Sequence, residues 1–568
     1  MELKRWLLPA SLLLCLPACL RPMTDPDLPW HLASARWILE HHAVPRADFF
    51  SWTRAGRPWV DFEWLAQLVL AGLDRLGGEP ALWLFKSLAF FALLLYLALL
   101  LKRWAVPDTW LAAALPPAAL TLAPYLNYRP ELFSLFLCLT QLAILEELRE
   151  RPWRWPAAHV LVLQAIIYSL WANLHGAFPL GLVLCLLYAA EGGRSGGLAL
   201  AQAAAAVLGT LANPYGIKLY TVFLQHARDW MLLRHYIVEW ADLELFDPPN
   251  LPHLGIILFS LAAAWAAVWK KVRLPRAHLG VFVLIGLFCS GAFRHSVYIP
   301  LLLLPLALKT CLRLKSGLWW RHARFGLAAG ILLFTLHADA KLVKLLPLLW
   351  TPRGQNDSAP TGAMRFLKSE RKTLAPLKFF NSWNCGGYLD YHLYPDYKVF
   401  LDGRYLFTDM LPELENADND PAAWQRYADR FGLEVVLFSL DRPRYRLDSR
   451  KAGPWRPFDV LAMSAKDWAL VYWDDMSMVF VRRRAVPTTW IASHEFRYLR
   501  PGDLQIVGLK TMSGMIPFAG IAKEVARYSK EIGAPIETIR IIAWFAALQK
   551  ETGRAAPAVT SGPGPRPD

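Results

Sequence analysis

Charged side chains are scarce in this chain. Only 19% of its 568 residues are Asp, Glu, Lys or Arg, whereas 55% are hydrophobic and 26 are tryptophan. This balance excludes an ordinary water-soluble enzyme and is typical of a membrane protein. The net charge of +15 does not indicate a nucleic-acid partner, because the basic residues form short clusters between apolar runs, such as KKVRLPR from Lys270.

Cysteine patterns with a chemical meaning are also lacking. The seven cysteines show neither metal-ligand spacing nor a disulfide framework, and the chain has no convincing internal repeat. The N-terminus, MELKRWLLPASLLLCLPACL, has the charged start and short apolar core of a signal peptide. LPAC weakly resembles a lipoprotein cleavage site, but we favour an uncleaved signal-anchor, because cleavage there would leave the acidic stretch that follows without a membrane helix in front of it.

Apolar runs recur through the first 350 residues at lengths close to the ~20 residues that a bilayer requires. They fall near residues 6–21, 80–101, 109–126, 131–147, 157–173, 176–190, 198–212, 253–269, 278–293, 297–311 and 325–347. About eleven transmembrane helices are therefore expected. With a cytoplasmic N-terminus, the basic loops at 102–103, 149–154, 194, 270–276 and 309–324 all become cytoplasmic, as the positive-inside rule requires.

This topology places nearly every unusual polar cluster on the outer face of a plasma (inner) membrane. TDPDLPWH, YLNYRPE, WANLHG, NPYG and GAFRHS all lie there, and so does the chain after residue 350. We read NPYG as a turn. The first outer loop, residues 22–79, shows two amphipathic helical patterns that we expect to lie in the membrane interface, with the turn-rich stretch AVPRADFFSWTRAGRPWV between them.

The composition changes after residue 350. GGYLDYHLYPDYKVFLDGRY predicts two short strands around a Pro-Asp turn, LEVVLFS a buried strand, and WALVYWDDMSMVFVRR a hairpin, with a helical stretch near Ala422 to Phe431. The predicted fold is thus a predominantly α-helical polytopic membrane protein, residues 1–350, with a small extracytoplasmic α/β domain, residues 351–502. A helical segment (503–552) and a disordered tail (553–568) follow.

A multi-spanning chain with an acidic pair at the start of its first outer loop, two interfacial helices and an outer C-terminal domain resembles the GT-C superfamily of membrane glycosyltransferases. It is similar to bacterial members related to the dolichyl-phosphate-mannose mannosyltransferases and to the aminoarabinose and lipopolysaccharide-core transferases. The residues that carry the resemblance are TDPDLPWHLASARWILEHHAVPRADFFSWTRAGRPWVDFEWL, NYRPE, WANLHG, NPYG and GGYLDYHLYPDYKVFLDGRY. It spans roughly residues 1–500.

The resemblance implies transfer of a hexosyl or pentosyl group from a polyprenyl-phosphate carrier to a lipid, glycan or protein acceptor at the outer membrane face. It also implies that a first-loop acid is the general base or a ligand of a divalent metal. That role falls on Asp25 or Asp27, and we prefer Asp27 because it is nearer the interfacial helix. Mg²⁺ or Mn²⁺ at Asp27 is an option, although no spacing requires a metal. Asp48, Asp61 and Glu63 are further first-loop acids.

Positively charged side chains are expected near the departing phosphate, because they stabilise the negative charge that develops on it. Arg129 precedes Pro130 at the start of a predicted helix, and Arg294 with His295 ends GAFRHS. Each arginine has the alternative of contacting lipid headgroups. His175 in WANLHG either contacts substrate or hydrogen-bonds within its turn. Asp402 and Arg404, in FLDGRY, either pair with each other or touch the carrier phosphate or sugar.

Two other classes of function remain open. A transporter or flippase for a lipid-linked glycan would also need polar groups, but it usually has ionisable residues near mid-helix and repeated helices, whereas here the charge gathers at one face. A non-catalytic envelope assembly protein would not explain the clustered acids, arginines and histidine. An O-antigen ligase or polymerase, which uses a pyrophosphate-linked glycan, is a neighbouring enzyme class that residue types do not separate. We favour the glycosyltransferase.

Overall fold

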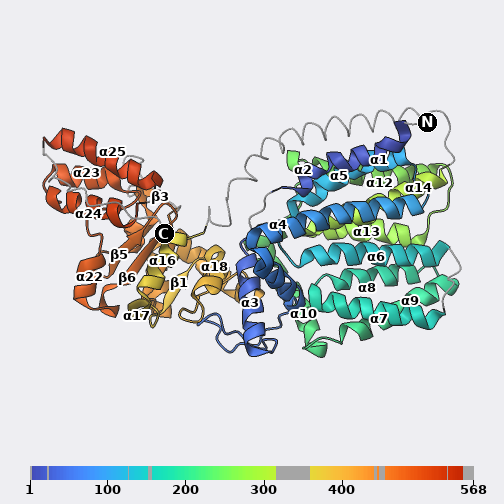
Figure 1. Ribbon diagram of the computed structural model, residues 1–568, viewed down its shortest axis with the longest axis horizontal. Coiled ribbons are helices and arrows are strands. Elements are labelled where there is room, and N and C mark those ends of the chain that lie inside the picture. The colour runs from blue at the N-terminus through green and yellow to red at the C-terminus, as the bar shows by residue number, and fades with distance from the viewer. Residues whose placement is uncertain are drawn as a thin grey trace. The chain divides into compact units, whose positions relative to one another are not determined.

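The computed structural model describes residues 3–21, 25–125, 127–150, 156–314, 359–440, 444–446, 455–533 and 535–553. Its contacts divide the chain into two units. The first comprises Met1–Ala47 and Pro58–Gly354, and the second comprises Asp48–Arg57 and Gln355–Asp568. The first unit is helical, and the second contains the β-sheets (Figure 1). Ten residues from the first loop therefore belong to the second unit.

Most helices of the first unit lie where the sequence predicts them, but α10 and α11 lie between two apolar runs, where no helix was expected. They are α1 (Leu3–Leu14), α2 (Leu16–Cys19), α3 (Leu28–His41), α4 (Trp64–Arg103), α5 (Asp108–Leu122), α6 (Glu131–Glu150), α7 (Ala157–Leu174), α8 (Phe178–Ala189), α9 (Gly193–Thr210), α10 (Tyr220–Arg228), α11 (Trp230–Tyr236), α12 (Leu251–Trp269), α13 (Arg276–Gly291) and α14 (Leu304–Arg313). The short turns η3 (Val238–Trp240) and η5 (Phe293–Tyr298) matter for the site. Long helices pack side by side, among them α7 on α9 and α8 on α6 (Figure 1).

Within the described residues, four helical stretches are long and apolar enough to cross a membrane: Trp64–Arg103, Ala157–Leu174, Pro248–Trp269 and Phe293–Arg313. Shorter apolar helices are Trp6–Cys19, Phe178–Ala189 and Arg276–Phe288. The membrane character is thereby supported, and the count of eleven stays a prediction. The run at 325–347 lies outside the described residues.

The first loop has the two predicted helices. α3 follows Asp27, its N-cap residue, and has a proline in its first turn, where a missing N–H costs nothing. Glu63 is the N-cap residue of α4. Non-helical backbone angles at Gly77 and Gly78 divide α4 into a first-loop part and a longer apolar part. A positive φ of 61° at Gly78 is one that a glycine adopts without strain.

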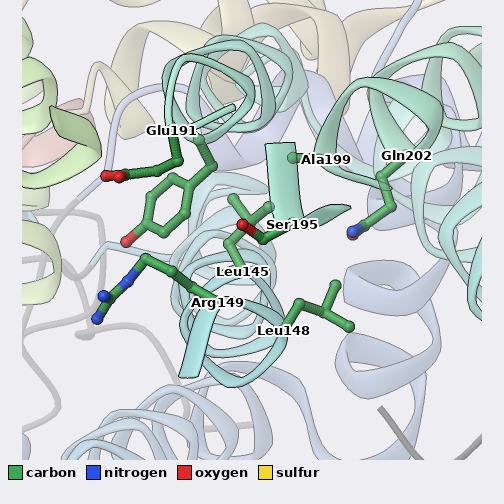
Figure 2. A pocket seen from close by; sticks show the side chains of 8 residues that line it. Leu145, Leu148, Arg149, Glu191, Ser195, Ala199 and Gln202 are labelled. Carbon is green, nitrogen blue, oxygen red and sulfur yellow. The ribbon is translucent and has the colours of Figure 1, made fainter. Parts of the chain in front are cut away.

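A second polar cluster lies toward the far end of α6 from Arg129. Glu146, fully buried, lies 2.9 Å from His278 Nε2 and pairs with Lys309. It is roughly 22 Å from the start of α6, at 1.5 Å per residue. A small cavity of about 10 Å³ lies beside it, lined by Leu145, Leu148, Arg149, Tyr188, Glu191, Ser195, Ala199 and Gln202 (Figure 2). Glu146 and Arg149 lie near the end of α6 and His278 lies in the first turn of α13, whereas Lys309 lies in the middle of α14.

The second unit contains a four-stranded sheet in the order β1-β2-β6-β5. β1 pairs parallel with β2, and the other pairs are antiparallel. The strands are β1 (Phe379–Asn381), β2 (Val435–Ser439), β5 (Trp468–Trp473) and β6 (Ser477–Arg482), with a separate pair β3 (Arg444–Arg446) and β4 (Trp455–Pro457). The predicted strand LEVVLFS and the hairpin turning at Asp474 and Asp475 are confirmed.

The remaining regular elements of the second unit are helices. They are α16 (Thr361–Ser369), α17 (Arg371–Leu374), α18 (Trp383–Leu393), α19 (Leu411–Asn419), α20 (Pro421–Phe431), α21 (Phe458–Ala462), α22 (Thr488–His494), α23 (Leu504–Met512), α24 (Phe518–Glu531) and α25 (Pro535–Thr552). Of these, α16 and α22 pack against strands of the sheet. The helices predicted near Ala422 to Phe431 and over 503–552 are confirmed. The proposed disordered tail lies outside the described residues, apart from Gly553.

The predicted pair of strands in GGYLDYHLYPDYKVFLDGRY is wrong, because its first half forms the helix α18. Leu389 and Leu393 are buried at a helical spacing of four. The alternating aromatic residues had suggested a period of two instead. Gly386 lets α18 pack closely against the backbone at Leu401. A Cβ at position 386 would lie 2.2 Å from the Leu401 carbonyl oxygen.

Candidate active site

The guanidinium of Arg129 is the meeting point of three carboxylates in the first unit. Its Nε lies 2.8 Å from Asp25 Oδ2, and its Nη2 lies 2.9 Å from Asp27 Oδ2. Its Nη1 lies 2.6 Å from Glu239 Oε1. The acids come from the start of α3 and from η3, and Arg129 comes from the turn before α6. One positive charge faces three negative ones, so the group carries a net negative charge when all three acids are ionised.

The two first-loop acids differ in their surroundings. The Asp25 side chain is fully buried, and both its oxygens accept from Arg129 Nε. One of them also accepts the backbone N–H of Asp27 at 3.0 Å. The Asp27 side chain is 28% exposed. Burial and the nearby Asp25 and Glu239 carboxylates raise the pKa of Asp27 to about 6, against the opposing effect of Arg129. Asp27 is thus the acid open to a ligand.

Glu239 is a site residue that the sequence analysis missed. Burial would raise the pKa of Glu239, but Arg129 and Arg294 outweigh burial and hold it below its ordinary value. Arg294 Nη1 lies 4.0 Å from Glu239 Oε2, and its guanidinium packs 5.1 Å from the centre of the Trp240 ring. The signal that could have found Glu239 is a lone acid between aromatic and apolar residues, IVEWA, in an outer loop.

His175 lies at the end of α7, opposite Glu63. Its Nε2 is 3.5 Å from Glu63 Oε1, and its Nδ1 is 2.7 Å from Ser134 Oγ. Burial, together with the charges of Arg294 and Arg129, lowers the pKa of His175 to about 3, so the imidazole is neutral. The backbone N–H of His175 donates to the Trp171 carbonyl and closes the last turn of α7, whereas the side chain contacts residues outside its own turn.

The same corner of the site contains His31, Asp61 and Gln67. Gln67 Nε2 donates to Asp61 Oδ1 at 2.7 Å and lies 3.4 Å from His31 Nδ1. Burial and the Arg129 charge hold the pKa of His31 well below its ordinary value. Tyr215, in the NPYG turn, accepts the Asp61 N–H at 3.0 Å and donates to the Pro45 carbonyl at 2.7 Å. The turn therefore also fixes the first loop.

His295 lies within a group of aromatic rings. It stacks on Phe288 at 3.8 Å between ring centres and lies 5.8 Å from Trp240. Its Nδ1 is 3.2 Å from the Phe288 carbonyl oxygen. A role for His295 at a phosphate stays a prediction.

Asp402 and Arg404 lie in the second unit, and they pair with each other as one sequence alternative expected. Arg404 Nη2 donates to Asp402 Oδ2 at 2.6 Å and to Asp48 Oδ1 at 2.7 Å. Arg404 is 2% exposed and Asp402 is fully buried. Asp48, from the first-loop segment, also accepts from Ser51, so this ion pair fixes that segment within the unit.

A divalent metal at Asp27 would have to compete with Arg129. The carboxylates that could share a cation with Asp27 are those of Asp25 and Glu239, and both bind the same guanidinium. Among the residues that the structure describes, no group of three or more His, Cys, Asp or Glu side chains is arranged to hold a metal ion. As arranged, this donor set does not fit a metal.

Comparisons with known proteins come from structure rather than sequence. No protein-family model matches the chain, and no curated protein matches it. The oligosaccharyltransferase of Archaeoglobus fulgidus with a tethered acceptor peptide is 11% identical, with a TM-score of 0.50 over 78% of this chain and 69% of that chain. The same archaeal enzyme with an inhibitory peptide and a dolichol-phosphate is 10% identical, with a TM-score of 0.50 over 77% and 69%. The chain therefore shares its fold with this archaeal membrane enzyme.

Proposed function

We propose that the chain is a glycosyltransferase that moves a sugar from a polyprenyl-phosphate carrier to a lipid, glycan or protein acceptor at the outer face of the plasma membrane. The observation that carries this proposal is the convergence of Asp25, Asp27 and Glu239 on Arg129 in a chain with the GT-C fold. A single, largely buried guanidinium that binds three acids, one of them open to a ligand, is costly to desolvate and is typical of a functional site.

Asp27 acts as the general base. The acceptor hydroxyl attacks the anomeric carbon, the bond from that carbon to the phosphate oxygen breaks, and the electron pair leaves with the phosphate. Asp27 takes the hydroxyl proton. With a pKa raised to about 6, it is ionised at neutral pH yet basic enough to accept a proton. Asp25, with both oxygens on Arg129, is a positioning residue.

Arg294 is the cation that faces the departing phosphate. The Arg294 side chain is 25% exposed, and its Nη1 lies 4.0 Å from Glu239 Oε2. Arg129, in contrast, already forms ion pairs with three acids. A guanidinium on a phosphate stabilises the charge that develops as the bond breaks. Arg129 then acts indirectly, by fixing the acids. No step passes through a metal.

The archaeal neighbour supports the donor class, because its structures are described with a dolichol-phosphate and with an acceptor peptide. For the present chain, the acceptor class is open to direct test. Purified protein is supplied with synthetic polyprenyl-phosphate sugars, hexose or pentose, carrying radiolabel, together with membrane extract. Label that moves into the protein, lipid or glycan fraction identifies the acceptor. Carrier binding without transfer from any donor would favour a lipid-linked-glycan transporter instead.

A further inference from the structure

Two aromatic residues hold Glu63 from either side. Trp64 Nε1 donates to Asn173 Oδ1 at 2.7 Å. Phe62 packs against Gly176, where an added Cβ would lie 3.0 Å from the Phe62 ring. Asn173 and Gly176 flank His175 in the WANLHG turn. The backbone at Glu63 is therefore fixed at two points against the turn that carries His175, and this is the preorganisation that a catalytic group requires.

The hydrogen-bond chain behind His175 favours one of its two neutral tautomers. Trp171 Nε1 donates to Ser134 Oγ at 2.7 Å. The direction of this hydrogen bond is certain, because an indole N–H can act only as a donor. Ser134 is fully buried, so its hydroxyl hydrogen needs an acceptor, and His175 Nδ1 lies 2.7 Å away. Since Nδ1 accepts, the neutral imidazole carries its hydrogen on Nε2, the nitrogen that faces Glu63.

A neutral N–H facing a carboxyl group is a hydrogen-bond donor without a positive charge. The charged and titratable groups around Glu63 are Asp61 beside it, Asp27 at α3, His175 at α7, Arg129 before α6, and Arg294 in η5. Burial, with Asp61 and Asp27, raises the pKa of Glu63 to about 8, although the two arginines oppose the rise. Glu63 therefore holds its proton at neutral pH, whereas Asp27 does not.

We propose that Glu63 is the proton donor to the departing phosphate, paired with the base Asp27, and that Trp171, Ser134 and His175 are positioning residues that orient it. This assignment rests on the proposed function. As the bond from the anomeric carbon to the phosphate oxygen breaks, that oxygen takes the Glu63 proton while Asp27 takes the acceptor proton. A return of the proton from Asp27 to Glu63 resets the site, so the net change is one proton moved from acceptor to phosphate.

The different protonation states of Glu63 and Asp27 agree with their proposed roles as acid and base. Two carboxylic acids held at different protonation states by their surroundings are a common acid and base arrangement. Glu63 is 13% exposed, so its carboxyl can still reach a ligand. The distance of 3.5 Å to His175 is long for a hydrogen bond, as is frequent at active sites without substrate.

The test compares pH profiles of kcat and kcat/KM for the wild type, Glu63→Gln and a matched control, Glu40→Gln, an exposed acid in α3. The wild type should lose activity as pH rises through about 8, because Glu63 must be protonated. Glu63→Gln should lower kcat about 10²- to 10³-fold and remove this alkaline limb. Glu40→Gln should match the wild type. Ser134→Ala should shift the limb, and Ser134→Thr, which keeps the hydroxyl, should restore it.

Infrared difference spectra of the purified protein, wild type minus Glu63→Gln, give a readout that needs no substrate. A protonated carboxyl band at neutral pH that is absent from the variant is expected, and an ionised Glu63 at that pH overturns the assignment. Wild-type rate and an unchanged alkaline limb in Glu63→Gln would overturn the donor role alone. Absence of transfer by the wild type with every donor would overturn the proposed function and the donor role together.

Discussion

Arg129 and Asp25 form a buried ion pair in which one guanidinium nitrogen meets both carboxylate oxygens, at 2.8 Å and 3.1 Å from Nε. This pair separates the roles of two acids that are only two residues apart. Asp25 is fully buried in the contact, whereas Asp27 meets Arg129 through Oδ2 and keeps part of its side chain exposed.

Breaking the Asp25 pair should cost stability. Asp25→Asn weakens the contacts with Arg129 Nε but leaves Asp27 and Glu239 as charge partners of that arginine, so we expect a loss of about 1–3 kcal/mol in the free energy of unfolding. Thermal unfolding in detergent measures it. Asp108→Asn is the matched control, because Asp108 is partly exposed and lies 3.6 Å from Lys102. An equal and small effect for both variants would show that the Asp25 pair contributes nothing to stability.

Arg129→Ala should unfold or strongly destabilise the first unit rather than chiefly weaken carrier binding. It would leave three carboxylates together without their shared cation. Arg294→Ala, in contrast, should leave the unfolding temperature nearly unchanged and reduce transfer, with a weaker Kd for the polyprenyl phosphate. Size-exclusion profiles and carrier titrations distinguish the two. A folded Arg129→Ala protein with a normal unfolding temperature would contradict this account.

The pH dependence of transfer should have an acid limb set by Asp27. The base must be ionised to accept a proton, so activity should rise as pH increases through about 6, the raised pKa of Asp27. The limb should persist in Glu63→Gln, which alters only the alkaline side. Initial rates across the pH range check this. A limb near pH 4, the ordinary range of an aspartate, would show that the base lies in a different environment.

Chelation should leave transfer unchanged, because Arg129 already supplies the positive charge shared by the acids. The assay is run after extensive dialysis against EDTA, with and without added Mn²⁺ or Mg²⁺. Loss of transfer on chelation, restored by one of these ions, would show that a metal displaces Arg129 from Asp27.

The second unit should depend on Arg404. Arg404→Ala leaves Asp402 and Asp48 buried without their partner, and we expect a cost of about 3–5 kcal/mol in the stability of that unit. Limited proteolysis after residue 358 reports it, with Arg371→Ala, which removes an exposed pair with Asp396, as control. Equal protease resistance of the two variants would contradict the structural role of Arg404.

The sequence predicts the helices of the first unit well, because long apolar runs and clustered basic loops leave few alternatives. It also predicts the acidic start of α3 and the Asp402 and Arg404 pair. It does not predict α18, where Leu389 and Leu393 fit a helix while the aromatic residues between them alternate like a strand. Nor does it predict that Asp48–Arg57 belongs to the second unit, because that depends on the distant Arg404.

In the candidate site, too, the sequence indicates residue types but not the contacts between distant residues. Asp25, Asp27 and Arg129 could be selected from the sequence by residue type, but their contact could not, because 104 residues separate Asp25 from Arg129. Glu239 lies another 110 residues along the chain, in a loop without a recognisable motif. Which of the two aspartates is open depends on packing, and Ser134 and Trp171 lie inside helices where nothing in their spacing indicates a role.

The most direct test of the central claim is transfer of radiolabelled sugar from a synthetic polyprenyl phosphate by the purified wild type, by Asp27→Asn and by Asp108→Asn. The account predicts transfer by the wild type and by Asp108→Asn, and a loss of at least about 10²-fold in Asp27→Asn, with normal expression and membrane insertion. Transfer at the wild-type rate by Asp27→Asn would contradict Asp27 as the base, and no transfer by any of the three proteins would contradict the proposed enzyme.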